Sequence, residues 1–448
     1  MSYSNSSHYK QILIGRPKGN VTIPIEAKTI GFKYYESIFS PILTASLTYY
    51  DVGDLVRASS NVDVQRRLGT LRDSLPIIGK GEESVEFFIE NESGFLDFRE
   101  SPFKVSNPTP ILQTSQSESV SLSLLSESSV INGTHKSFKS YHNTISSSVE
   151  KILTDEMGFS PTKVFVDQTS NSDSFRMNGN RPFDIITSLS KKSISATGGP
   201  GYFFWETQNG MNYKSIDSII QSEPVATYTH TDVMFDTDDR RNDFKILKEP
   251  VYHNNSNILS NMYSGVPMIK ETSFNISDFS YSENYKSLST FAYPTLGMGM
   301  GIIDPDSLYN ESDKTIDTDW LTNVDFSRTI FSLLDAGSTN PGISTTVVNS
   351  EKFYLSRSIQ RYNLLMSHVI DIIVPCNLGL NAGDTINCIF QKVSFDSKHK
   401  GNKSELNSGK YMITHLCHDF TPRSSYTSLR IVRDTPGIYT STEITSNV

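Results

Sequence analysis

His368-Val-Ile-Asp-Ile-Ile-Val-Pro-Cys-Asn-Leu-Gly-Leu-Asn-Ala-Gly-Asp-Thr-Ile386 opens the part of the sequence that decides the fold. Two further runs follow it, Ser408-Gly-Lys-Tyr-Met-Ile-Thr-His-Leu-Cys-His-Asp-Phe420 and Thr427-Ser-Leu-Arg-Ile-Val-Arg-Asp434. These runs hold many β-branched and aromatic residues, and glycines mark the turns between them. This pattern is typical of short strands in a small β-barrel. We expect one more strand before them, at Arg357–Tyr362.

The composition is that of a β-rich chain with several domains. A length of 448 residues exceeds one ordinary core, so we expect about three or four domains. Hydrophobic residues make up only 36%, whereas Tyr and Phe number 21 and 25. Such a chain suits sheets that have much of their surface near water or partners. The predicted fold class is therefore α+β and predominantly β.

Charge and cysteine content argue against several kinds of function. A formal net charge of −9 disfavours a surface that binds nucleic acid by neutralising phosphates, although nucleic acid can slide past such a surface. Cys376, Cys388 and Cys417 are odd in number and lack metal-type spacing, so we expect free thiols in a reducing cytosol. The polar N-terminus does not have the pattern of a signal sequence. We expect no stable membrane insertion, because no apolar run approaches the roughly 20 residues that span a bilayer.

Residues 1–108 read mostly as strands. Short apolar runs occur at Tyr9–Ile14 and Val21–Ile25, and much of the long stretch Ile30–Val56 alternates between apolar and polar residues. Apolar residues also alternate with glutamates within Val85–Ile89. This alternation is the mark of half-buried strands, so the first unit is predicted to be a β domain.

Residues 109–218 change from strand spacing to helical spacing. Val120, Leu122 and Leu124 alternate with serines, which is the pattern of a strand. Apolar residues then recur at helical intervals between Tyr141 and Leu153, and Pro182 suits the first turn of a second helix. An aromatic hairpin follows, with Asn209-Gly210 as its turn. This unit is therefore predicted to be α+β.

The remaining chain is predicted to be a second set of strands with an interruption. Strands return in 219–253, but 254–347 is rich in Ser and Asn and has only a weak pattern. We expect an irregular insert there, with one helix over Trp320–Leu334. The terminal strands occupy 348–434, and 435–448 is a polar tail.

Several quoted stretches carry a family resemblance in chain order. They are Phe32-Lys-Tyr-Tyr-Glu-Ser-Ile-Phe-Ser-Pro-Ile-Leu-Thr-Ala45, Leu75-Pro-Ile-Ile-Gly-Lys-Gly-Glu-Glu83, Arg181-Pro-Phe-Asp-Ile-Ile186, Tyr202-Phe-Phe-Trp-Glu-Thr-Gln-Asn-Gly-Met-Asn-Tyr-Lys-Ser-Ile216, Asn261-Met-Tyr-Ser-Gly265 and the three terminal runs. Together they resemble the baseplate hub proteins of contractile-tailed bacteriophages, which are related to the barrel region of type VI secretion spike proteins. The likeness covers most of the chain.

The resemblance implies a fold and an assembly. Each chain would contain two tube-type β-barrels, a central α+β domain and an irregular inserted region. Three chains would form a homotrimer with pseudo-six-fold symmetry, because barrel strands can pair edge to edge in a closed ring. The implied domains are 1–108 for the first barrel, 109–218 for the central domain, 219–253 with 348–434 for the second barrel, 254–347 for the insert and 435–448 for the tail.

The function implied by the resemblance is that of a structural hub in a phage baseplate. A trimeric ring would adapt the six-fold tail tube to a three-fold central spike and line the DNA passage during genome ejection. Its partners would be tail tube or tube-initiator proteins, the trimeric spike and surrounding baseplate proteins, with no sequence-specific DNA binding. It would reside in the virion tail after assembly in the host bacterial cytoplasm.

Two other functions compete with the hub interpretation. A tail-associated cell-wall hydrolase would need a pocket with convergent carboxylates or a metal. A spike protein of a tailocin or secretion system would share the barrel, but such proteins usually continue into a β-helical needle. We favour the hub, because no β-helical repeat follows the terminal strands.

His415-Leu-Cys-His418 is the strongest candidate for a metal site or a nucleophile. In a strand, His415 and Cys417 point to one face while His418 points to the other, so a single site would break the alternation. Packing within a strand is the simpler role for all three side chains.

Other suggestive residues also have simpler roles. The glutamates within Glu82–Glu92 would need a defined separation to cleave a glycoside. Gly297-Met-Gly-Met-Gly301 lacks the spacing of a nucleotide loop, and Asp236–Asp243 and Asp304–Asp306 lack that of a calcium loop. We therefore predict no catalytic, cofactor-binding or metal-binding residue and no enzymatic activity. We expect six aromatic residues to belong to the core: Tyr34, Tyr35, Tyr49, Tyr50, Trp205 and Tyr213.

Overall fold

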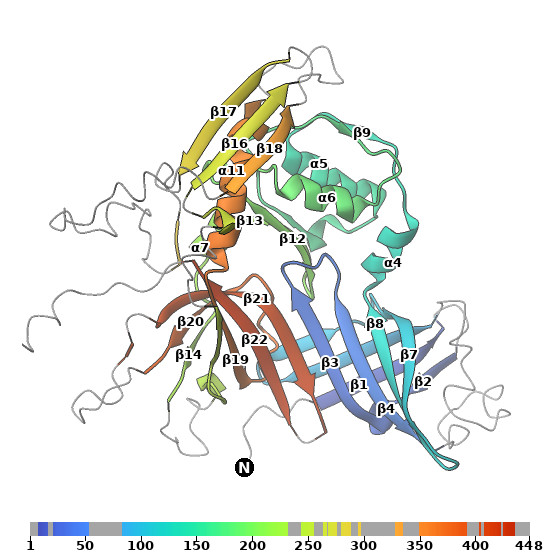
Figure 1. Ribbon diagram of the computed structural model, residues 1–448. Helices are drawn as coiled ribbons and strands as arrows, with labels where there is room; N and C mark the ends of the chain where they lie inside the picture. The colour runs from blue at the N-terminus through green and yellow to red at the C-terminus, as the bar shows by residue number, and fades with distance from the viewer. Residues whose placement is uncertain are drawn as a thin grey trace, which may run out of the picture.

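A large curled sheet and an α+β body dominate the molecule (Figure 1). The computed structural model describes residues 8–16, 21–52, 83–231, 243–254, 263–266, 268–275, 279–287, 294–296, 328–334, 349–391, 403–404, 407–422 and 424–434. The predicted class, α+β with strands predominating, is confirmed. Among the helices within these ranges, none combines the length and the apolar character needed to cross a membrane.

The first half of the large sheet comes from the N-terminal quarter of the chain. Its strands are β1 (His8–Arg16), β2 (Val21–Pro24), β3 (Thr29–Ser37), β4 (Thr44–Asp51), β5 (Ser84–Asn91), β6 (Gly94–Asp97), β7 (Phe103–Gln113) and β8 (Glu118–Leu125). They follow the order β3-β4-β8-β7-β5-β1-β2, and β6 pairs with β5. The short 3-10 helix η1 (Glu26–Lys28) separates β2 from β3.

The structure adds two details to the expected pattern of this half. The stretch Ile30–Val56 contains two antiparallel strands, β3 and β4, because the chain turns between Ser37 and Thr44. The expected boundary at residue 108 falls inside β7. Since β8 pairs with both β7 and β4, the first half of the sheet continues to Leu125.

The second half of the sheet is built mainly from the C-terminal runs. Its strands are β14 (Ala226–Thr229), β15 (Val251–Asn254), β19 (His368–Pro375), β20 (Thr385–Ile389), β21 (Gly409–Phe420) and β22 (Ser425–Arg433). The order is β15-β19-β22-β21, while β20 pairs with β21 and β14 pairs with β20. The strands predicted in the three quoted runs are therefore confirmed.

The strand expected at Arg357–Tyr362 is wrong, because this segment belongs to α11 (Asn349–Leu365). Ser356, Gln360 and Leu364 are buried at intervals of four residues, which is the period of one helix face. Ser356 donates to Glu271, and Gln360 donates to the carbonyl oxygen of Val266 at 3.3 Å. This face of the helix therefore packs against residues of the insert, and tertiary contacts determine its conformation.

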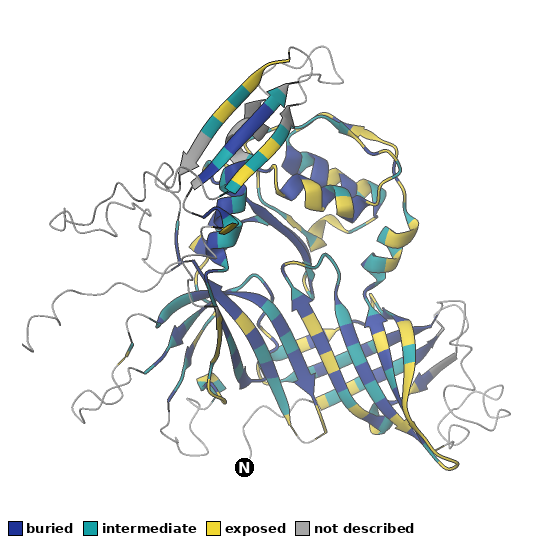
Figure 2. Ribbon diagram, in the orientation of Figure 1, coloured by how far each residue is buried: buried dark blue, intermediate teal, exposed yellow. Residues whose placement is uncertain are grey.

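Both halves of the sheet enclose one continuous apolar core. Phe32 and Phe87 of the first half belong to the same buried cluster as Leu416 and Phe420 of the second. Buried and more exposed residues alternate along β3, β4 and β8 (Figure 2). This alternation gives the sheet one core face and one solvent face.

The central unit covers one end of the sheet. Its elements are α4 (Glu127–Thr134), β9 (Ser140–Tyr141), α5 (Ile145–Lys151), the π-helical η2 (Ile152–Glu156), η3 (Pro161–Lys163), β10 (Val164–Val166), β11 (Phe175–Arg176), α6 (Pro182–Ser190), β12 (Tyr202–Thr207), β13 (Gly210–Ser215) and α7 (Ile216–Gln221). The helices predicted near Ile145 and Pro182 and the aromatic hairpin are confirmed. Gly210 has no substitute here, because a Cβ would lie 2.1 Å from the carbonyl oxygen of Lys163.

The insert contains a small sheet where we expected irregular chain and a helix. β16 (Met268–Asn275) pairs antiparallel with β17 (Tyr281–Ser287) and parallel with β18 (Arg328–Leu334). The expected helix is therefore wrong over 328–334, while Trp320 lies outside the described residues. Thr329, Ile330 and Phe331 are β-branched or aromatic residues, which favour a strand when a neighbour such as β16 can pair with them. The sheet stands at the top of Figure 1, against α11.

Candidate assembly site

The two halves of the large sheet meet where β21 pairs with β3, and we call this line of pairing the seam. The antiparallel register runs from His415 opposite Ser37 to Phe420 opposite Phe32. The earlier part of β21, from Gly409 to Met412, pairs instead with β20. An irregularity between Ile413 and His415 bends the strand at the change of partner. One strand is therefore shared by both halves of the sheet.

A buried carboxylate closes the end of the seam. Glu36 accepts hydrogen bonds from the Tyr34 hydroxyl at 2.6 Å, the backbone NH of Gln208 at 3.0 Å and the backbone NH of Ala382 at 2.8 Å. Burial raises its pKa to about 7, although these three hydrogen bonds favour the charged form. Glu36 thus joins β3, the β12–β13 turn and the loop before β20 at one point.

The β12–β13 hairpin is anchored beside Glu36 by two neighbouring side chains. Trp205 is buried, and its indole NH donates to the carbonyl oxygen of Ala382 at 2.8 Å. Glu206 accepts hydrogen bonds from the hydroxyls of Ser126 and Ser128 at 2.7 and 2.6 Å, and burial raises its pKa. One strand therefore contacts the first half of the chain through Glu206 and the second half through Trp205.

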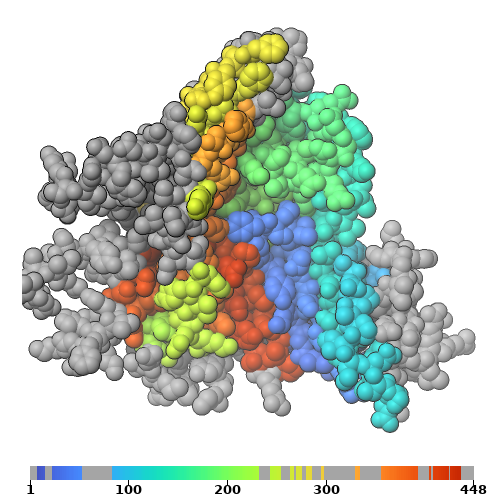
Figure 3. Space-filling model, viewed as in Figure 1, coloured from blue at the N-terminus to red at the C-terminus, as the bar shows by residue number. Residues whose placement is uncertain are grey.

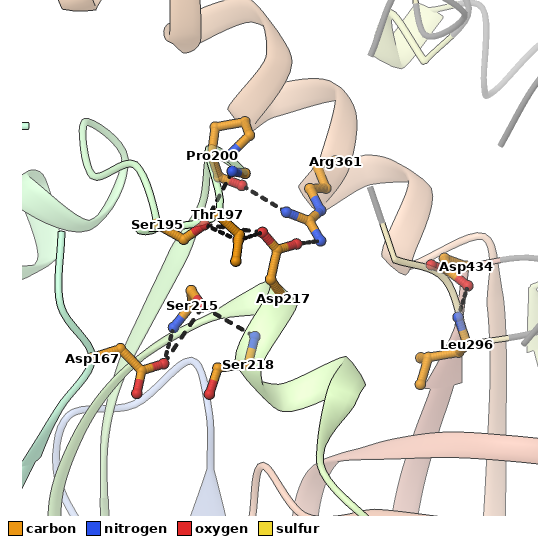
Figure 4. A network of polar contacts seen from close by, with 11 residues as sticks. Asp167, Ser195, Thr197, Pro200, Ser215, Asp217, Ser218, Leu296, Arg361 and Asp434 are labelled. Carbon is orange, nitrogen blue, oxygen red and sulfur yellow. Dashed lines mark hydrogen bonds and ion pairs between the residues drawn. The ribbon is translucent and has the colours of Figure 1, made fainter. Parts of the chain in front are cut away.

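A buried ion pair attaches α11 to the central unit (Figure 4). Arg361 donates to Asp217 and, at 3.3 Å, to the carbonyl oxygen of Pro200. Ser195 and Thr197 donate their hydroxyls to the other oxygen of Asp217 at 3.0 and 2.9 Å. Both charged residues are only 3% exposed, so water screens this pair little.

A groove of about 550 Å³ lies on the solvent face of the seam. Apolar lining residues include Ile42, Val251 and Ile373, and Cys417 lies in the same groove. Burial raises the pKa of the Cys417 thiol to about 11, so the thiol is protonated at neutral pH. This side chain therefore lines the groove as an uncharged group.

Three charged residues on this face form one cluster around Asp371. Arg430 donates through two nitrogens to the two carboxylate oxygens of Asp371, at 2.8 and 3.0 Å. His253 lies 2.6 Å from the same carboxylate. Burial opposes ionisation of Asp371, but the hydrogen bonds from Arg430 and His253 outweigh it and lower its pKa. Lys248 and Glu249 also line the groove, outside this cluster.

The structure separates the residues that suggested a metal or a nucleophile. His415 and Cys417 face the groove, whereas His418 is buried in the core against the ring of Tyr34. The predicted division between two faces is confirmed. Burial lowers the pKa of His418 to about 3, and its Nδ1 lies 2.9 Å from the Thr427 hydroxyl. In the part of the chain that the structure describes, no group of three His, Cys, Asp or Glu residues is placed to hold a metal.

The other candidate residues are scattered. Cys376 and Cys388 are buried free thiols, Glu83 is buried, and Glu90 forms a surface ion pair with Lys10 at 2.7 Å. Four predicted features lie outside the described residues: Glu82, 236–242, 297–301 and 304–306. Of the six aromatic residues assigned to the core, four are buried and two are partly exposed because they occupy the alternate strand positions: Tyr35 and Tyr50.

The polar residues of the seam were not identified from the sequence. One signal was present for Glu36, which continues the inward-facing positions of Phe32 and Tyr34 along β3. A carboxylate at an inward-facing position of a strand is buried, and a buried carboxylate needs hydrogen-bond partners. The pairing of Asp217 with Arg361 had no such signal, because the two residues lie 144 positions apart.

Comparisons with known proteins agree with this architecture. No family model and no curated protein matches the sequence. The 43 kDa tail protein of prophage MuSo2 from Shewanella oneidensis is 10% identical, with a TM-score of 0.50, over 95% of this chain and 98% of that chain. The tail protein from Neisseria meningitidis MC58 is 10% identical, with a TM-score of 0.49, over 96% and 97% of the two chains. Prophage tail protein gp18 from Listeria monocytogenes EGD-e is 11% identical, with a TM-score of 0.47, over 94% of each chain.

The similarity to the Shewanella protein shows a shared fold over nearly the whole of both chains. The predicted resemblance to phage tail proteins is therefore confirmed at the level of the fold. The chain has the architecture of a phage tail protein.

Proposed function

We propose that the chain is a structural hub protein of a phage tail baseplate. The observation that carries this proposal is the shared fold with the Shewanella tail protein, which spans 95% of this chain and 98% of that chain. The polar residues at the seam support it, because Glu36 is buried and, like Glu206, accepts hydrogen bonds that hold structural units together. The hub interpretation assigns the molecule a mechanical task and no enzymatic one.

We infer that the two halves of the sheet act as two tube-type barrels. In the first half, η1 bridges β1 and β4, because the backbone NH of Ile12 donates to Glu26 at 2.8 Å and Lys28 donates to Asp51 at 2.9 Å. In the second half, Lys245 bridges to Thr229 of β14, and Leu247 donates to Ile373 of β19 at 2.7 Å. Hydrogen bonds thus link the two sides of each opening. The first barrel would then extend to Leu125, the central domain would begin at residue 126, and the other predicted domains keep their bounds.

We further propose that three chains form a ring. Two barrels in each chain give six barrels in a trimer, which matches a six-fold tail tube on one face and a three-fold spike on the other. The ring would line the DNA passage without binding any particular sequence, inside the virion tail. Baseplate proteins would surround it.

The decisive experiment is an electron microscopy reconstruction of the native particle at a resolution that traces strands. We expect a three-fold ring of six barrels beneath a six-fold tube. A monomer or two-fold dimer away from any tube would contradict the hub proposal. Release of peptidoglycan fragments by the purified chain would instead favour a cell-wall hydrolase.

A further inference from the structure

The pairing of β9 with β11 brings several cations to one place on the central unit. Residues 134–142 and 175–181 contain four Lys or Arg residues and no Asp or Glu, although the whole chain has a formal net charge of −9. Ser140 lies opposite Arg176 in this pairing. The backbone contacts continue beyond the two strands, because Met177 donates to Lys139 and Gly179 donates to Ser137. We call the paired residues 136–141 and 175–179 the basic ladder.

The basic ladder has an inner face and an outer face. Ser137, Tyr141 and Met177 are buried on the inner face. Because side chains alternate along a strand, Lys136, Phe138 and Arg176 belong to the outer face, and all three are exposed. β9 lies on the outer side of the central unit in Figure 1, and Figure 3 shows that side as a teal and green surface. The outer face therefore presents two cations and one aromatic ring to solvent.

Phe138 is held on this face although it is 64% exposed. Its ring lies so close to Gly179 that a Cβ on that glycine would be 3.1 Å from the ring. Gly179 also has a φ of +77°, which side chains other than glycine rarely adopt. A local backbone feature thus positions an exposed aromatic ring beside an arginine. Aromatic residues and Arg are both enriched where proteins bind one another.

The two outer cations, Lys136 and Arg176, have no ion-pair partner in the described part of the chain. Neighbouring carboxylates make other contacts: Glu156 lies 3.7 Å from Lys139, Asp173 lies 3.7 Å from Lys192, Asp155 accepts from the Thr154 hydroxyl, and Asp184 follows Arg181 in the first turn of α6. Even if Asp184 offsets Arg181, the charges of Lys136 and Arg176 remain uncompensated. The outer face is therefore locally positive on an acidic chain.

An acidic protein segment fits this surface better than a polyanion does. DNA or an anionic lipid surface presents negative charge over a wide area, so it would also face the rest of a chain with a net charge of −9. A short segment can contact Lys136 and Arg176 alone. The Arg176 guanidinium can bind a carboxylate through two parallel hydrogen bonds, and Phe138 offers apolar area beside it.

We propose that the outer face of the basic ladder docks an acidic segment of another baseplate protein. Carboxylates of that segment would contact Lys136 and Arg176, and an apolar side chain would cover Phe138. This inference rests on the proposed hub function, which places other proteins around the ring. β9 and β11 form a sheet separate from the large sheet of the two proposed barrels, so we assign this face to a surrounding protein and not to a second copy.

Photochemical cross-linking in assembled particles tests the proposal directly. The photoreactive residue p-benzoylphenylalanine is placed at position 138, and in a second variant at position 178 on the same outer face. After irradiation, mass spectrometry should identify a peptide of another baseplate protein in which Asp or Glu residues flank the linked position. The same residue at position 95 is the matched control, because Phe95 is 61% exposed but lies opposite a carboxylate, Glu90. It should not link to that peptide.

Charge reversal then tests whether the ion pairs hold the segment. Arg176→Glu should lower the yield of the cross-link by about tenfold, whereas Arg176→Lys, which keeps the charge, should lower it much less. Reversal of the identified partner carboxylate to Lys should restore the yield in the Arg176→Glu background. A merely structural role of Arg176 would not give that rescue.

The outcomes separate the docking proposal from the hub proposal. Docking is overturned by the absence of a link from both positions, by links only to this chain or to nucleic acid, by a linked peptide without Asp or Glu, or by a yield that Arg176→Glu leaves unchanged. Each of these results leaves the hub proposal intact if the chain forms a three-fold ring in the same particles. Particles without that ring contradict the hub proposal whatever the cross-links show.

Discussion

The carboxylate of Glu36 accepts a 2.8 Å hydrogen bond from the backbone NH of Ala382, which lies 346 residues further along the chain. The same carboxylate accepts a hydrogen bond from Gln208 in the central unit. Three parts of the sequence are thus fixed to one ionisable side chain. The stability of the joined unit should therefore depend on the protonation of that side chain.

Glu36 should make the stability of the folded chain fall as the pH rises toward neutrality. Its pKa is raised from 4.5 to about 7 in the folded chain, so the protonated form is the one that folding favours. The stabilisation is fully present below the unfolded pKa and is lost as the pH rises through about 7. A shift of this size corresponds to about 3 kcal/mol.

The variant Glu36→Gln removes this titration. In urea unfolding between pH 4.5 and 7.5, we expect its free energy of unfolding to change less with pH than that of the parent chain. Glu92→Gln, at an exposed turn position, controls for the loss of one carboxylate. Parallel pH profiles for the parent chain and Glu36→Gln would refute this prediction.

His418 should have the opposite effect at acid pH. Burial lowers its pKa to about 3, so folding favours the neutral imidazole. Its stabilisation is fully present above the unfolded pKa of about 6.5 and declines as the pH falls toward 3. His418→Phe should therefore lose less thermal stability than the parent chain between pH 7 and pH 4. His142→Phe, at an exposed position, should follow the parent profile in differential scanning fluorimetry.

Removal of one member of the buried Asp217–Arg361 pair should be strongly destabilising. Arg361→Met leaves the Asp217 carboxylate buried with only hydroxyl donors, at a cost of about 3–5 kcal/mol. The double variant Asp217→Leu, Arg361→Met removes both charges and should recover part of that loss. Urea unfolding measures both values. If the double variant is less stable than Arg361→Met, the unpaired Asp217 carboxylate is not the cause of the lost stability in Arg361→Met.

Gly383 should resist substitution more than a helical glycine. Its φ is +92°, and a Cβ would lie 2.4 Å from the ring of Trp205. Gly383→Ala should cost about 2–4 kcal/mol through backbone strain and overpacking. Gly133→Ala is the matched control, because nothing lies within 4 Å of a Cβ in α4. That variant should be neutral or stabilising by up to about 1 kcal/mol, and melting temperatures of the two variants test the difference.

Local patterns identified most strands but not the contacts that join distant parts of the chain. The alternation in β19 and over Thr414–His418 of β21 reflects one buried face, and a single sequence displays that directly. α11 was assigned to a strand because its contacts with Asp217 and with the small sheet do not appear in its own sequence. β18 was assigned to a helix for the same reason, since its partner β16 lies far away along the chain.

The candidate site depends still more on long-range contacts. The groove becomes apparent only when the region around Val251 is placed beside β3, β19 and β21.

The shared strand β21 has a mechanical consequence. Because its first part pairs with β20 and its later part with β3, a load on one half of the sheet reaches the other through the covalent backbone of a single strand. The halves cannot slide past each other at a noncovalent surface without tearing hydrogen bonds from that strand. Tension or torque across the seam is therefore shared by the hydrogen bonds of the β3–β21 ladder.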